Sequence, residues 1–103
     1  MIESVREWLE RDVLTATEGR LQFHTRVAIN ALAIVERELV LGAPHDAAHR
    51  DRLQALGVAD DAELAASIRS GALDDRLDEV RTLVWQSVRD KLAVANPKYL
   101  TSP

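Results

Sequence analysis

The stretch RLQFHTRVAINALAIVERELVL, residues 20–41, is the longest apolar run in the chain and decides the fold. On a helix of 3.6 residues per turn, its apolar residues form one broad face, which comprises Leu21, Ala28, Ala31, Leu32, Val35 and Leu39 and is extended sideways by Phe23, Val27, Ile34 and Leu41. A helix that is apolar over more than half its girth normally packs on two or more sides. The pattern therefore predicts a central, buried helix with Leu32 in the core.

Two residues that follow this run predict where the helix ends. Gly42 tolerates a positive φ at the position after a helix, and Pro44 cannot continue a helical hydrogen-bond ladder. We therefore expect the central helix to stop at Leu41.

The remaining segments also have helical periodicity. Residues 2–16 predict an amphipathic helix, residues 46–56 and 61–70 predict two short helices, and residues 75–96 predict a long C-terminal helix that begins at a cap by Asp74 or Asp75. Asp60 or Asp61 is expected to cap the second short helix, and Gly71 to end it. Asn96 before Pro97 should end the last helix. No run alternates with period two, so the expected fold is an all-α, small helical bundle of about five helices with a long central and a long C-terminal helix. We expect a single domain over residues 1–103.

Composition narrows the class of protein. The chain is 47% hydrophobic and has a net charge of −4 without any block of like charge, which disfavours nucleic acid and anionic membranes as partners. It contains no cysteine, which excludes disulfides and cysteine-ligated metal. Its longest uncharged stretch, residues 27–35, is less than half of the roughly 20 residues that a membrane span needs. These features, with no signal-peptide pattern at the start, predict a cytoplasmic protein.

Polar residues interrupt the central helix at two places. His24 lies within the apolar arc and is interpreted first as a core-edge imidazole bonded to a backbone carbonyl. Arg26, Asn30 and Arg37 share a narrow stripe on the other side. One interpretation makes them structural fasteners that bind nearby loops or helix ends, and the other makes them an anion or carboxylate site.

The sequence lacks the common catalytic and cofactor motifs. We find no phosphate-binding glycine loop, no nucleophile elbow, no zinc-protease motif and no calcium loop. His45 and His49 lie four residues apart beside Asp46, but no clear third ligand accompanies them. The sequence therefore predicts no metal and no cofactor, and it offers no support for an enzyme.

Two stretches resemble a known family. GRLQFHTRVAINALAIVERELVLG, residues 19–42, and KLAVANPKYL, residues 91–100, are similar to the signature stretches of a small bacterial domain of unknown function. That domain occurs beside, or fused to, aminoglycoside-phosphotransferase-like kinases and acyl-CoA dehydrogenases. The matching residues are Arg20, Phe23, His24, Asn30, Glu36, Arg37 and Glu38 in the first stretch and Lys91, Asn96, Pro97 and Tyr99 in the second. The resemblance implies a context and no catalytic role.

Two functions follow as expectations. The favoured one is a non-catalytic accessory or protein-interaction domain whose partner is a kinase-like protein, an acyl-CoA dehydrogenase-like protein or a second copy of the chain. The alternative is a small-molecule-binding or enzymatic domain with a pocket for an anionic acyl or phosphate group. The candidate ligand or partner site consists of His24, Asn30, Arg37, Lys91, Asn96 and Tyr99.

Overall fold

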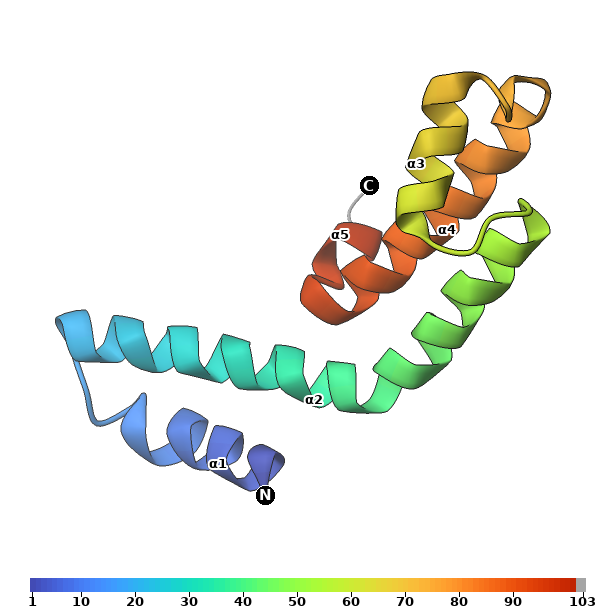
Figure 1. Cartoon of the computed structure of the whole chain (residues 1–103). Helices are drawn as coiled ribbons and strands as arrows, with labels where there is room; N and C mark the ends of the chain where they lie inside the picture. Colours follow the sequence, from blue (N-terminus) through green and yellow to red (C-terminus); the bar gives the residue numbers. More distant parts are fainter. Residues whose placement is uncertain (102–103) are drawn as a thin grey trace. The chain divides into compact units, whose positions relative to one another are not determined.

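The computed structural model describes residues 1–101 and is helical from end to end (Figure 1). Its elements are α1 (Ile2–Trp8), the π-helical η1 (Leu9–Val13), α2 (Gly19–Ala55), α3 (Asp61–Ser70), the 3₁₀ turn η2 (Asp74–Arg76), α4 (Leu77–Ala95) and α5 (Lys98–Thr101). The predicted all-α class is confirmed, and α2 and α4, with 37 and 19 residues, are the long helices that the sequence predicts. No helix that residues 1–101 form is long and apolar enough to cross a membrane.

The chain divides into two compact units, residues 1–41 and the part from Gly42 onward. The boundary lies at the predicted helix end after Leu41, but α2 continues through it to Ala55, so the predicted helix end is wrong. Gly42 and Pro44 both lie within α2, and the predicted short helix 46–56 is its C-terminal part. Proline removes only one helical N–H, and its cost of about 3 kcal/mol can be offset where flanking turns are well packed or strongly helix-forming. Gly42 consequently does not serve as a C-cap.

The first unit is a helical hairpin. The Arg6 Nε atom on α1 donates to Glu36 Oε1 on α2 at 2.6 Å, and the Gln22 amide donates to the carbonyls of Leu14 and Thr17 at the connection. These pairs run the two helices antiparallel, with α1 alongside the N-terminal part of α2 (Figure 1). Thr25 is buried in this unit, and its hydroxyl donates to the carbonyl of Leu21.

The prediction that Leu32 lies in the core is wrong. Leu32 is only half-buried, and neither α1 nor η1 has a buried residue. The apolar arc of residues 20–41 is real, but the hairpin supplies a single neighbouring helix, α1. The rest of the arc remains accessible to solvent. Hydrophobic periodicity cannot predict this, because it assumes that every apolar face packs against another segment.

The core lies in the second unit. Six buried apolar residues form one cluster: Leu53, Leu56, Val58, Leu64, Leu73 and Val80. They come from the end of α2, the turn after it, α3, the turn before η2 and α4. Periodicity does not mark the middle segments as core because each has only two or three large apolar residues, but those few residues converge from several elements and exclude water together.

Most of the helix ends that nearby capping residues predict in this unit agree with the structure. The Asp60 side chain accepts from the backbone N–H of Glu63 at 2.8 Å, so Asp60 caps α3 as predicted. Gly71 ends α3 with φ +82°, a left-handed conformation that glycine adopts without strain. Asn96 follows α4 as predicted. The predicted cap at Asp74 or Asp75 is wrong, because these residues form η2 and α4 begins at Leu77 without a side-chain cap bond.

Candidate functional site

The six residues that the sequence selects belong to both units. His24, Asn30 and Arg37 lie on α2 in the first unit, and Lys91, Asn96 and Tyr99 lie on or after α4 in the second. All are exposed except Arg37, which is half-buried. The site that they were predicted to form stays a prediction.

His24 differs from its predicted environment. Its imidazole is exposed on α2, where Nε2 lies 3.4 Å from Arg20 Nε and its ring stands edge-on to Phe23, with ring centroids 5.7 Å apart. The predicted core-edge imidazole bonded to a carbonyl is therefore wrong. Phe23 is itself 63% exposed, so the pair lies on the accessible side of the helix.

Asn30, which belongs to the polar stripe that the sequence interprets as structural fasteners or an anion site, has an exposed side chain. With Arg26, Ile29, Glu10 and Leu14 it lines a shallow surface depression of the hairpin. The depression has no enclosing walls. It therefore offers little of the concave, mostly apolar burial that small-molecule sites provide.

A polar network that the sequence did not predict connects α2, α3 and α4 within the second unit. The His49 Nδ1 atom lies 2.7 Å from Ser87 Oγ, and its Nε2 atom lies 2.7 Å from Asp61 Oδ1. A carboxylate can only accept, so Nε2 carries the proton toward Asp61. In the neutral ring Nδ1 then accepts the proton of the Ser87 hydroxyl. Arg52 Nη1 donates to the same hydroxyl oxygen at 3.0 Å.

Arg52 also links this network to a second carboxylate. Its Nη1 atom lies 3.0 Å from Asp90 Oδ2, and His45 Nε2 lies 3.8 Å from Asp90 Oδ1. A cavity of about 70 Å³ is lined by His45, Asp46, His49, Arg52, Ser87, Asp90 and Lys91. Lys91 is thus the one sequence-selected residue that the structure places beside the network.

The serine, histidine and aspartate have the order of an acyl-transfer triad, but the geometry opposes that chemistry. Ser87 is only 8% exposed, and a guanidinium already donates to its oxygen. The cavity of about 70 Å³ is far below the roughly 300 Å³ of a small-molecule pocket and has room for about two waters. We therefore interpret the network as a structural connection that satisfies a buried hydroxyl.

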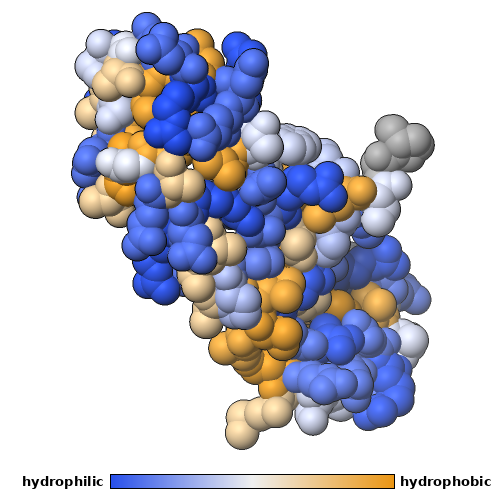
Figure 2. Space-filling view, turned by 90° about the vertical axis from the view of Figure 1, so that its right-hand side faces the viewer, coloured by the Kyte–Doolittle hydropathy of each residue, from blue (hydrophilic) through white to orange (hydrophobic). Residues whose placement is uncertain are grey.

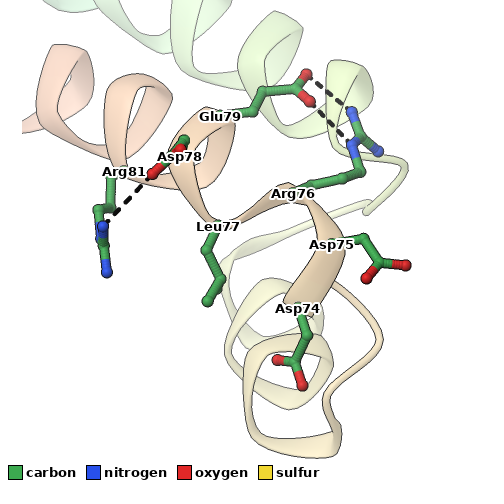
Figure 3. A pocket seen from close by; sticks show the side chains of 7 residues that line it. All are labelled: Asp74, Asp75, Arg76, Leu77, Asp78, Glu79 and Arg81. Atoms are coloured by element: carbon green, nitrogen blue, oxygen red, sulfur yellow. Dashed lines mark hydrogen bonds and ion pairs between the residues drawn. The ribbon is translucent and has the colours of Figure 1, made fainter.

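A second connection joins the end of α2 to the start of α4. Arg76 donates from Nε and Nη2 to the Glu79 carboxylate, at 2.9 and 2.8 Å, and its Nη2 atom also donates to the Ala55 carbonyl at 2.8 Å. Hydrogen bonding to Arg76 lowers the pKa of Glu79. Figure 3 shows Arg76 and Glu79 pointing toward each other, whereas Asp74 and Asp75 point away from the pair. The surrounding hollow is thus lined by a structural pair and solvated carboxylates.

The largest unexplained feature is the apolar surface of the first unit. Its exposed large apolar side chains are Met1, Val5, Trp8, Leu21, Phe23, Val27, Ile34, Val35, Leu39 and Val40. Leu39 and Val40 are 71% and 73% exposed, although leucine and valine are among the residue types most often buried. Figure 2 shows hydrophobic side chains gathered in the lower part of that view, beside strongly hydrophilic ones. Contiguous apolar surface of this kind marks interaction sites.

The fold and this surface define a small all-α domain with an exposed apolar hairpin. The chain belongs to the family described as Domain of unknown function (DUF6285), whose profile matches residues 15–99. No curated protein and no solved structure matches the chain. The match contains both stretches on which the family resemblance was based, except for Leu100.

Proposed function

We propose that this chain is a non-catalytic accessory domain that binds another protein through the apolar surface of its first unit. The observation that carries the proposal is the contrast between the two units. The second unit buries six apolar side chains in one cluster, whereas the first unit buries none of its large apolar side chains and leaves ten of them exposed.

The energetics of the hairpin support a binding role. A 41-residue hairpin buries too little apolar surface to offset the conformational entropy of its ordering, which is on the order of 1.5 kcal/mol per residue. Burial of the exposed apolar side chains against a partner would add stabilising free energy of about 25 cal/mol per Å² of apolar surface. A protein partner provides such cover, and the partner surface should be apolar because the exposed residues are.

One face of α2 in particular is suited to a partner. Leu21, Thr25, Leu32, Val35 and Leu39 recur at helical spacing along it. Thr25 is buried and Leu32 half-buried in the hairpin, whereas Leu21, Val35 and Leu39 remain open, with 61%, 42% and 71% of their surface exposed. We propose that the partner binds to this face of α2.

The partner to test comes from the resemblance. Relatives that resemble this chain occur beside, or fused to, aminoglycoside-phosphotransferase-like kinases and acyl-CoA dehydrogenases. We propose that an enzyme of one of these two classes binds the chain. The chain would then act by positioning or stabilising that enzyme, without chemistry of its own.

The test is co-expression with a kinase-like protein and with an acyl-CoA dehydrogenase-like protein from the same genome, followed by affinity measurement on each purified pair. Leu39→Glu should weaken binding about tenfold or more, because it places a charge in an apolar contact. Val84→Glu on α4 is the matched control, since Val84 is 39% exposed and lies in the other unit. Equal binding by the wild type and Leu39→Glu, or no binding to either enzyme, would refute the proposal.

A further inference from the structure

A second face of α2 has features that the proposed enzyme partner does not explain. Arg20, His24, Val27, Ala31, Ile34 and Glu38 follow one another at alternating steps of four and three residues. This spacing forms a straight row along one side of a helix, as the core positions of a helical coiled coil do. We call these six residues the outer row.

The outer row is fully exposed and lies opposite the hairpin contact. Every one of its six members is exposed. On α2, Glu36 binds Arg6 of α1, and Gln22 binds the carbonyls of Leu14 and Thr17 in the connection. At about 100° per residue Gln22 and Glu36 lie roughly 160–200° around the helix from the centre of the row. No contact within the hairpin therefore needs the row.

The charges of the row are arranged for self-recognition. Arg20 stands at its N-terminal end and Glu38 at its C-terminal end, with no charged member between them unless His24 is protonated. The two ends are 18 residues apart, about 27 Å along the helix. A second copy that approaches antiparallel places Glu38 beside Arg20 at both ends, whereas a parallel copy places like charges together.

The apolar middle of the row is complementary in the same register. When Arg20 of one copy faces Glu38 of the other, Val27 faces Ala31 and His24 faces Ile34. Val27 thus meets the smaller Ala31 on each side of the twofold axis, and the small Ala31 permits close approach of the helices. An isologous contact of this kind closes after two copies.

We infer that two copies of the chain associate through the outer rows of α2, antiparallel, with Arg20 of each copy paired with Glu38 of the other. One helix face of five turns buries on the order of 500 Å² per copy, below the roughly 800 Å² of a standard interface. The dimer should therefore be weak, with a dissociation constant of about 1–100 μM. This inference goes beyond the proposed function because it uses a different face of α2.

The experiment is sedimentation of the full chain between about 1 and 500 μM, a range that spans the expected dissociation constant. The wild type should shift from 11.5 kDa toward twice that mass. Ala31→Glu should abolish the shift while helix content stays constant, because position 31 is exposed and Glu is a good helix former. Arg11→Glu, at another exposed arginine of the hairpin, is the matched control and should leave the dimer unchanged.

A charge-exchange pair tests the register. Arg20→Glu or Glu38→Arg alone should raise the dissociation constant about tenfold, since each removes two ion pairs by symmetry and creates repulsion. The double variant Arg20→Glu/Glu38→Arg should restore the wild-type value. A wild type that stays at 11.5 kDa overturns the inference, as does a dimer that survives Ala31→Glu or a double variant that is not restored. A chain that dimerises as expected without binding either enzyme would refute only the proposed function.

Discussion

Arg6 on α1 and Glu36 on α2 form the main polar contact of the hairpin, with Arg6 Nε 2.6 Å from Glu36 Oε1 and Arg6 Nη2 3.3 Å from Glu36 Oε2. Arg6 Nη1 also binds Glu10 at 3.0 Å. The hydrogen bonds that Arg6 donates to these two carboxylates, chiefly to Glu36, raise the pKa of Arg6, so the guanidinium stays charged at any accessible pH. This two-point contact is the clearest restraint on α1, since α1 and η1 contribute no buried side chain.

We expect Glu36→Gln to loosen α1 from α2, because a neutral amide cannot replace a two-point ion pair with a guanidinium. Amide hydrogen exchange in residues 2–13 should become several-fold faster, whereas the core around Leu56 should keep its protection. Glu18→Gln, which is exposed and lies outside the outer row, is the control. Unchanged exchange in α1 would show that apolar contacts alone hold it.

Leu56→Ala should destabilise the fold by about 2–5 kcal/mol, because Leu56 is 3% exposed and its truncation leaves a cavity in the only buried cluster of residues 1–101. Leu32→Ala should cost clearly less, about 1–2 kcal/mol, since Leu32 is half-buried. Urea unfolding of both variants measures the difference. A larger loss of unfolding free energy for Leu32→Ala than for Leu56→Ala would show that Leu32 lies in the core, as the sequence predicts.

The contrast between these two leucines explains much of what sequence could predict. The caps at Asp60 and Gly71 and the end at Asn96 depend on residues close in the chain, and those predictions hold. Which apolar face is covered depends on distant segments, so the arc around Leu32 gave the wrong core. The helix end predicted from Pro44 is wrong for a related reason. Proline disfavours a helix interior only statistically, and packing can outweigh that preference.

The polar network shows the same limit. His49 and Ser87 are 38 residues apart, and nothing in the sequence near Ser87 marks it as the partner of a histidine. The one local signal was the spacing of His45 and His49, which place both imidazoles on the side of α2 that faces Asp90 and Ser87. Helical phase identified the pair, but the fold was needed to identify what it contacts.

Ser87→Ala should destabilise the second unit by about 1–3 kcal/mol, because it removes the shared partner of His49 and Arg52 and leaves their polar atoms with one contact fewer. Thr82→Ala on the same helix should change stability by less than about 0.5 kcal/mol, since that hydroxyl is exposed and binds only its own turn. Thermal melting of both variants compares them. Equal melting temperatures would show that the Ser87 hydroxyl is dispensable.

The Glu79 carboxylate should make stability depend on pH. Its pKa is lowered in the folded state, chiefly by the hydrogen bonds from Arg76, so its contribution is present above the unfolded pKa of about 4.3 and is lost as pH falls through the lowered folded value. Glu79→Gln should therefore melt at a lower temperature than wild type at pH 7, with a gap that narrows toward pH 3. Asp75→Asn, whose side chain points away from the pair, is the control (Figure 3). A gap that stays constant with pH would mean that charge is not the cause.

Pro44→Ala should stabilise the chain by about 1–3 kcal/mol. Pro44 lies in the interior of α2, where it cannot donate to the carbonyl four residues earlier and its ring crowds that turn. Alanine restores the N–H and is the best helix former, which favours the variant by up to about 3 kcal/mol, while the greater freedom of its unfolded chain offsets up to about 1 kcal/mol. Urea unfolding measures the gain, and Ala43→Gly, at the preceding exposed position, should instead destabilise by about 1 kcal/mol. If Pro44→Ala is neutral or destabilising while Ala43→Gly behaves as expected, then the proline favours a local α2 geometry that the fold requires.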